Sequence, residues 1–263
     1  MFIKIFQKFM ITVKTKEKIE ILREGGKKLA KIMKEISQKA EPGIKTIELD
    51  KIAEALILKA GGEPSFKNYK TKDDRIPYPA SLCVSLNDEV VHGLPSEKII
   101  LKNGDIVSLD LGMKYKGLYT DIALTIGIGT IDKKAGKLLK ICKIALAKSI
   151  KQAKEGRTLG DIGFIIQSYV ESHGFQVVRK LVGHGVGYSV HEEPDIPNWG
   201  EPGQGEVLKR GMVLAIEPMI VEGGPDVFLT SDGWTWKTKD GSRAAHFEHT
   251  IAVGKNKGEI LTL

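Results

Sequence analysis

The sequence contains few cysteines, few aromatic residues and no long hydrophobic run. Only two of its 263 residues are cysteines, and Cys83 and Cys142 form no CxxC pair, so neither a disulfide framework nor a zinc ribbon is expected. No apolar stretch approaches the roughly 18 to 20 residues that span a bilayer. Lysines interrupt the apolar residues of the N-terminal stretch MFIKIFQKFMITVK. We therefore expect a cytoplasmic protein with neither a membrane anchor nor a signal peptide.

Basic residues are in modest excess over acidic ones. The chain has 40 Lys and Arg against 33 Asp and Glu, which gives a formal net charge of +7. This surplus is compatible with a polyanionic partner, but the lysines are dispersed along helical segments rather than clustered with aromatic residues. A solvated, lysine-rich surface is the simpler interpretation. The hydrophobic fraction of 41% is typical of a globular protein with a large core.

Two segments of the chain repeat the order helix, turn, helix. Apolar residues at helical spacing predict a long amphipathic helix over residues 15–40, and a second helix follows it and ends near Gly61. The same order returns with a helix over residues 137–153 and another that ends before Gly174. The repetition indicates two similar halves.

Segments rich in Val, Ile and Thr and bounded by Gly or Pro lie between and after the helices, and they predict β-strands. They cover residues 80–86, 105–112, 119–127, 212–221 and 246–254. Combined with the repeated helices, these strands predict an α+β fold. Two duplicated halves would form one domain, with their strands joined in a shared antiparallel sheet.

The segment 104–127 predicts a β-hairpin that carries two aspartates. A turn centred on Tyr115 and Lys116 places Asp110 directly opposite Asp121, with Cβ atoms roughly 5 Å apart, where like charges are destabilising. A cation between the two carboxylates would relieve this repulsion. The alternative is a β-bulge that turns one of the aspartates outward.

Further candidate ligands follow in the second half of the chain. The glycine-rich segment 183–194 contains His184 and His191, and its glycines allow close approach of the backbone to a ligand. Glu217 and Glu248 each lie in a strand-like segment between apolar neighbours, where a carboxylate is costly to bury unless it is paired or bound to a metal. The glycines follow no nucleotide-binding pattern, so nucleotide binding is disfavoured.

Four carboxylates and one imidazole thus form a candidate metal site. Its members are Asp110, Asp121, His184, Glu217 and Glu248. Two divalent cations would balance the four negative charges, whereas one cation would leave an uncompensated charge in the interior. Oxygen-rich ligation with a single imidazole suits Mn, Fe, Co or Zn. A pair of such ions activates water and stabilises a tetrahedral intermediate, which predicts hydrolytic chemistry.

These motifs resemble the type I methionine aminopeptidases, metallopeptidases of the pita-bread fold, from about Ile11 to the C-terminus. The strings that match in order and spacing are PASLCVSLNDEVVHGLP, SLDLGMKYKGLYTDIA, GHGVGYSVHEEPDIPNWG, GMVLAIEPMI and FEHTIAV. The Xaa-Pro aminopeptidases and prolidases share the ligand set, so the flanking residues decide between these families. The segment from Pro64 to Gly93 resembles the methionine aminopeptidases, and the large extra N-terminal domain usual in the other two families is not found in the sequence.

The resemblance implies a single pita-bread catalytic domain over residues 11–263, with residues 1–10 as an extension and Met10 as an alternative start. It implies removal of the initiator methionine from nascent proteins and peptides that have a small second residue. Two divalent metal ions are implied as cofactors. Asp121, His184, Glu217 and Glu248 would hold one ion, and Asp110 would hold the other, with Asp121 and Glu248 bridging.

The resemblance also implies catalytic and substrate-binding residues. His191 would contact the scissile carbonyl oxygen, His92 would meet the peptide beyond it, and Glu217 would transfer the proton to the leaving amine. The positions that align with the family's methionine pocket are Phe66, Tyr69, Tyr78, Cys83, Val190 and Trp234. Three features depart from the family pattern: the segment 70–77 is longer than usual, Val190 stands where a larger apolar or aromatic residue is common, and His246 stands where Gln is common.

Nascent chains emerge at the ribosome, so the resemblance suggests weak electrostatic docking there by an otherwise monomeric enzyme. The candidate docking residues are Lys67, Lys70, Lys72, Arg75, Lys137, Lys140, Lys148 and Lys151. Two alternative functions remain at this stage. One is a related peptidase that cleaves Xaa-Pro bonds or dipeptides. The other is a non-catalytic binding module, which the presence of all five ligands disfavours.

Overall fold

The computed structural model describes residues 11–72 and 76–263, so the predicted extension 1–10 and Arg75 lie outside the described residues. In the part of the chain that the structure describes, four helices occur in two pairs, close to the predicted positions. They are α1 (Lys16–Lys39), α2 (Thr46–Lys59), α3 (Lys133–Ile150) and α4 (Leu159–Glu171). The side chains of Thr15 and Asp132 accept hydrogen bonds from the first backbone N–H groups of α1 and α3, which fixes where these helices begin. Among the described residues, no helix is both long and apolar enough to cross a bilayer.

Within residues 11–72 and 76–263, nine strands form one antiparallel sheet in the order β1-β4-β5-β14-β9-β7-β8, with β2 also paired to β4 and β15 to β14. Their bounds are β1 (Glu63–Pro64), β2 (Leu82–Leu86), β4 (Ile106–Tyr115), β5 (Leu118–Gly127), β7 (Val182–Gly185), β8 (Glu192–Pro197), β9 (Val213–Ile216), β14 (Glu248–Ala252) and β15 (Glu259–Ile260). Two three-stranded sheets comprise β6 (Gln176–Val177), β10 (Met219–Val221) and β13 (Ala244–His246), and β3 (Glu89–Val91), β11 (Val227–Leu229) and β12 (Trp236–Thr238). The shared antiparallel sheet is therefore confirmed.

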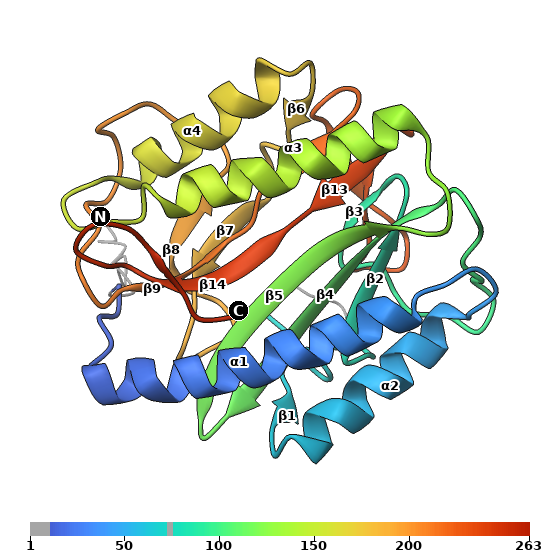
Figure 1. The fold of residues 1–263 in the computed structure, drawn as a ribbon, viewed down its shortest axis with the longest axis horizontal. Helices are drawn as coiled ribbons and strands as arrows, with labels where there is room; N and C mark the ends of the chain where they lie inside the picture. The colour runs from blue at the N-terminus through green and yellow to red at the C-terminus, as the bar shows by residue number, and fades with distance from the viewer. Residues whose placement is uncertain (1–10, 73–75) are drawn as a thin grey trace, which may run out of the picture.

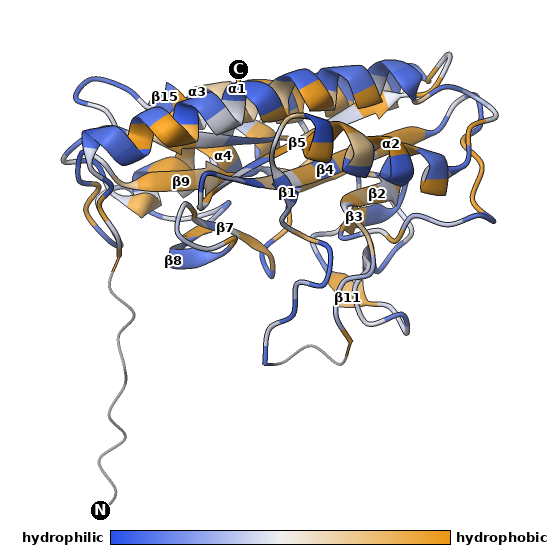
Figure 2. Cartoon of the chain, turned by 90° about the horizontal axis from the view of Figure 1, so that it is seen from below, coloured by the Kyte–Doolittle hydropathy of each residue, from blue (hydrophilic) through white to orange (hydrophobic). Residues whose placement is uncertain are grey.

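The helices lie along one face of the large sheet, and β3 and β11 of a small sheet lie on the opposite side (Figures 1 and 2). Each helix pair covers its own half of the sheet. Leu29 of α1 and Leu109 of β4 belong to one buried cluster, while Ile166 of α4 and Leu214 of β9 belong to another. This arrangement matches the two α+β halves expected from the repeated helices, and it leaves the opposite side of the sheet open for a site.

The β4–β5 hairpin differs from its predicted register. Its turn residues are Lys116 and Gly117, with φ angles of 47° and 80°, as a two-residue turn with positive φ at both positions requires. Asp110 is therefore opposite Ala123, and the predicted direct pairing of Asp110 with Asp121 is wrong. Moving the turn by one residue shifts each partner by two positions, so both aspartates still project from the same face. The ladder of this hairpin contains no bulge, which also rules out the alternative.

Two predicted strands are each divided in the structure. The segment 212–221 forms β9 and β10, which are separated at Glu217 and Pro218, because proline has no N–H to continue the ladder. The segment 246–254 is similarly divided at Phe247 into the end of β13 and β14. β10 and β13 leave the large sheet together and pair with each other. Glu217 and Glu248 consequently lie at the adjoining ends of β9 and β14.

Candidate metal centre

The five predicted metal ligands come from five neighbouring strands of the large sheet. Asp110 lies on β4, Asp121 on β5, Glu248 at the start of β14, Glu217 immediately after β9 and His184 on β7, and these strands are adjacent in that order. All five side chains are buried. The sheet therefore brings together residues that are widely separated in the sequence.

Small residues make room between these side chains. Ala123 on β5 lies directly opposite both Asp110 and Glu248, and Ala215 on β9 lies opposite His184. A methyl group at these central positions leaves the space above the sheet to the longer side chains on either side. The carboxylate side chains therefore project from the same face of the sheet and approach one another above it.

The converging atoms fit a divalent cation. One ligand atom each from Asp121, His184 and Glu248 lie within 4.8 Å of one another. His184 Nε2 lies 3.3 Å from Glu217 Oε1. The buried atoms Asp110 Oδ1 and Glu248 Oε1 accept no hydrogen bond from the described residues, which is costly for carboxylate oxygens. A cation bound between them would satisfy both.

The hydrogen bond of His184 orients its ring for this task. Its Nδ1 lies 2.9 Å from the carbonyl oxygen of Gly185. A carbonyl only accepts, so Nδ1 carries the proton and donates it, and Nε2 keeps its lone pair. The lone pair points toward the carboxylates, as a metal-binding imidazole requires.

The pKa values of the carboxyl groups show the cost of placing them together. Burial raises the pKa of Asp121 to about 6 and that of Glu217 to about 8. Burial and the neighbouring carboxylates raise the pKa values of Asp110 and Glu248 well above their usual range. Bound cations would favour the ionised forms and reverse these shifts.

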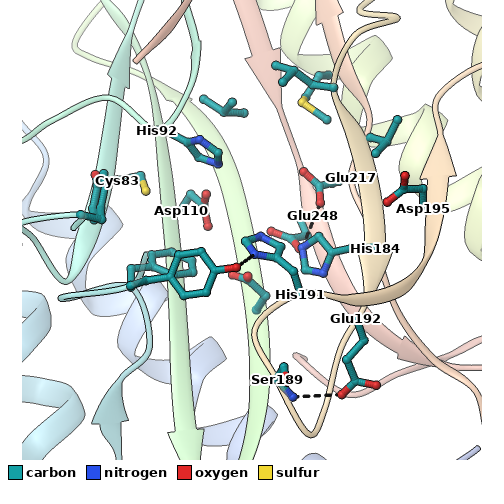
Figure 3. A pocket seen from close by; sticks show the side chains of 18 of the residues that line it. Cys83, His92, Asp110, His184, Ser189, His191, Glu192, Asp195, Glu217 and Glu248 are labelled. Carbon is teal, nitrogen blue, oxygen red and sulfur yellow. Dashed lines mark hydrogen bonds and ion pairs between the residues drawn. The ribbon is translucent and has the colours of Figure 1, made fainter. Parts of the chain in front are cut away.

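A cavity of about 690 Å³ opens above the carboxylates, and His92 and His191 point into it (Figure 3). The Nδ1 atom of His191 lies 2.6 Å from the hydroxyl oxygen of Tyr69. Desolvation, together with the nearby imidazoles of His184 and His92, lowers the pKa of His191 well below its usual value, so its ring is neutral. His92 adopts a positive φ of 59°, uncommon for a residue with a side chain. The two predicted catalytic histidines therefore face the same space as the carboxylates.

The predicted methionine pocket residues form one apolar cluster beside this site. Phe66, Tyr78, Cys83, Val190 and Trp234 are buried together, and Tyr69 packs against them. The rings of Tyr78 and Trp234 meet edge to face with centroids 5.2 Å apart. All six except Val190 line the cavity, so Val190 forms part of the wall behind it.

Several cavity residues were missed by the sequence analysis. Thr12 and Glu192 line the cavity, and Lys14 contacts both of them from the N-terminal segment. Glu192 follows His191 directly in the glycine-rich motif, and this position was the one sequence feature that pointed to a place at the site. His246, which received no role, lies with its Nε2 3.3 Å from Glu217 Oε2.

Comparisons with known proteins agree with the motifs. Residues 20–255 match metallopeptidase family M24. The methionine aminopeptidase of Clostridium perfringens is 46% identical over 254 residues, which cover 97% of this chain and 99% of that protein. The crystal structure of a methionine aminopeptidase from Thermotoga maritima superposes with a TM-score of 0.92 at 45% identity, covering 96% of this chain and 99% of that one.

A prolidase from Pyrococcus furiosus is less similar, with a TM-score of 0.77 at 25% identity, and the match covers 96% of this chain but 66% of the prolidase. These solved structures confirm the predicted pita-bread fold. The family match confirms that the chain is a metal-dependent peptidase by descent. The chain belongs to metallopeptidase family M24, and within it to the methionine aminopeptidases.

Proposed function

We propose that this protein removes the N-terminal methionine from nascent proteins and peptides whose second residue is small. One observation carries the proposal: the converging carboxylates and an apolar, sulfur-containing cluster line the same cavity. The first can hold the ions that hydrolysis needs, and the second suits an unbranched thioether side chain. The names of the most similar relatives support the same activity.

The proposed cofactors are two divalent ions of Co, Mn, Fe or Zn. Asp121, His184, Glu217 and Glu248 would hold one of them, and Asp110 would hold the other, with Asp121 and Glu248 shared. The unsatisfied oxygens of Asp110 and Glu248 support this assignment. When bound, such ions lower the pKa of water and polarise a carbonyl group.

The protein's own groups position the peptide and move the proton. The tautomer of His191 in which Nδ1 accepts a hydrogen bond from the Tyr69 hydroxyl leaves a proton on Nε2, which can donate to the scissile carbonyl oxygen as charge develops there. Glu217, which bound cations would keep ionised, would accept a proton from the attacking water. It would then pass that proton to the leaving amine. His92 would contact the peptide beyond the scissile bond.

The methionine side chain would occupy the apolar cluster. Aromatic rings such as those of Phe66, Tyr78 and Trp234 make favourable contacts with a thioether, and Cys83 adds a small polarisable wall. An apolar slot rejects a charged side chain strongly but discriminates against a shorter one by only about 1 to 3 kcal/mol. The second residue would be restricted to small side chains by the segment around His92.

The proposal includes a cellular setting. Residues 11–263 would act as one catalytic domain of a cytoplasmic monomer, with nascent chains as its substrates. The proposal also includes weak electrostatic docking of the lysine-rich surface at the ribosome. Lys67 forms an ion pair with Glu54 at 2.7 Å, so binding of Lys67 to a ribosomal phosphate would have to replace this pair. Co-sedimentation with ribosomes at low and moderate salt, comparing wild type with a charge-reversed Lys67, Lys70 and Lys72 variant, tests this part. Equal pelleting of both proteins would remove these lysines as docking residues.

Peptide cleavage tests the activity itself. The metal-loaded protein should release methionine from Met-Ala-Ser and should leave Met-Lys-Ser and Ala-Pro peptides largely intact. Efficient cleavage of Ala-Pro would favour the prolidase-like alternative, and a lack of all cleavage would favour a binding module.

A further inference from the structure

A buried ion pair joins the N-terminal segment to the rim of the cavity. Lys14 Nζ lies 2.7 Å from Glu192 Oε2, and the two side chains are only 1% and 9% exposed. Charges so far removed from water are costly unless they are paired and hydrogen-bonded. The proposed reaction uses neither side chain, so the pair calls for another explanation.

The carboxylate of Glu192 connects two parts of the chain through its two oxygens. Oε2 accepts hydrogen bonds from Lys14 Nζ and from the Thr12 hydroxyl, the latter at 2.6 Å. Oε1 accepts the backbone N–H groups of Tyr188 and Ser189, the latter at 3.0 Å. One side chain therefore links the N-terminal segment to the loop between β7 and β8.

That loop, residues 186–191, carries two residues of the proposed site. His191 faces the cavity, and Val190 belongs to the apolar cluster. Its opposite side is held by the Tyr119 backbone N–H, which donates to the carbonyl oxygen of Gly187 at 2.8 Å. Thr12, at the other end of the linkage, also lines the cavity.

The Lys14 side chain reaches Glu192 by passing directly over Gly187. A Cβ atom at Gly187 would lie 2.5 Å from Lys14 Cε, and the φ of +138° at this residue is one that side-chain-bearing residues rarely adopt. The backbone N–H of Lys14 donates to the carbonyl oxygen of Gly211 at 2.8 Å, which fixes the start of this path. The absence of a side chain at Gly187 therefore allows the N-terminal segment to pack closely against the loop.

We propose that Lys14 and Glu192 are positioning residues, whose ion pair holds the β7–β8 loop so that His191 meets the scissile carbonyl group. The inference rests on the proposed function, because the contact between His191 and the substrate is part of that function. In this proposal, the segment before α1 supports the active site in addition to leading into the first helix.

A double-mutant cycle with His191 tests the proposal. Lys14→Met retains the length of the side chain and removes its charge. We expect kcat on Met-Ala-Ser to fall by between about tenfold and a hundredfold, since small displacements of a catalytic group cost this much, with a smaller change in KM. The content of bound metal should stay as in wild type. In a His191→Ala background, Lys14→Met should cause almost no further loss, because the pair acts through His191.

Arg23→Met is the matched control. It removes the ion pairs of Arg23 in α1 with Glu259, at 2.7 Å, and with Glu20, away from the residues that line the cavity. We expect its kcat to equal that of wild type. If Lys14→Met does not fold, Thr12→Val takes its place in the same cycle with His191→Ala. It keeps both charges and removes the hydroxyl that donates to Glu192 and accepts from Lys14.

Three results would overturn the inference: wild-type kcat in the Lys14 or Thr12 variant, losses that add in the cycle with His191→Ala, or loss of bound metal in parallel with activity. Each would show that the pair does not act through His191. A wild-type protein that is inactive on Met-Ala-Ser when loaded with metal would instead contradict the proposed function.

Discussion

His246 Nε2 lies 3.3 Å from Oε2 of Glu217, and His184 Nε2 lies 3.3 Å from Oε1 of the same carboxylate. Burial lowers the pKa of His246 to about 4, so this imidazole is neutral, while burial raises the pKa of Glu217 to about 8. The carboxylate is therefore held between two imidazoles, each near a different oxygen.

Replacing Glu217 tests its role in proton transfer. Glu217→Gln retains the shape of the side chain but cannot carry the proton, so we expect kcat on Met-Ala-Ser to fall by about 10² to 10⁴ with a smaller change in KM. Steady-state kinetics, with the thermal unfolding midpoint as a control for folding, makes the comparison. An unchanged kcat would remove Glu217 from the catalytic mechanism.

Loss of a proposed ligand should abolish activity. Asp110→Ala and Glu248→Ala each remove an oxygen that is otherwise unsatisfied in the buried site, and each should lose nearly all methionine release even with excess metal. Metal content after dialysis should fall in parallel, which separates a ligand from a residue that only supports the fold. Full activity in either metal-loaded variant would contradict the five-ligand site.

Tyr69 should influence the rate through the tautomer of His191. Because its hydroxyl lies 2.6 Å from His191 Nδ1, Tyr69→Phe removes the group that directs the proton to Nε2. We expect kcat to fall by roughly tenfold, since a hydrogen bond of this kind contributes on the order of 1 kcal/mol or slightly more. Wild-type kcat in Tyr69→Phe would show that the hydroxyl does not set the tautomer.

The stability of the metal-free protein should fall as the pH rises from about 7 to about 9. Glu217 has a folded pKa of about 8, far above the value near 4.3 expected in the unfolded chain, so the folded state binds more protons than the unfolded state in this range. The free energy of unfolding therefore decreases as Glu217 ionises. His246, with a folded pKa of about 4, affects stability only at more acidic pH.

Bound ions should reverse this dependence, because they bind the ionised carboxylates and only in the folded state. Thermal unfolding with and without Mn²⁺ measures the effect, and the stabilisation by the metal should be larger at about pH 9 than at about pH 7. A metal-free protein that becomes more stable over this interval would contradict the assignment of these buried carboxyls.

The sequence contains enough information to place the metal ligands on one face of the sheet, but not to give the register in which the strands pair. Period-two alternation fixes which face of a strand a side chain takes, so Asp110 and Asp121 were assigned to the same face even with the turn displaced by one residue. The displacement came from Gly117, which favours the second position of the turn. Pro218 likewise signalled a break between β9 and β10 that the apolar pattern of the segment concealed.

Contacts between distant segments were beyond sequence analysis. Lys14 and Glu192 are separated by most of the chain, and each resembles an ordinary surface charge, so their pairing emerges only when the N-terminal segment is laid along the β7–β8 loop. His246 is similar, because its position beside Glu217 depends on the pairing of β13 with β10. Motif residues were predictable because the chemistry requires them, whereas their supporting residues depend on tertiary packing.

The most direct test of the account is a metal titration of the metal-free protein, followed by methionine release from Met-Ala-Ser. The account predicts no release without metal and activity that rises with added Mn²⁺ or Co²⁺ to a plateau at two ions per chain. It also predicts that Asp110→Ala binds fewer ions and gives almost no release at any metal concentration. Methionine release that is independent of divalent ions, or full activity from a protein lacking the Asp110 carboxylate, would contradict it.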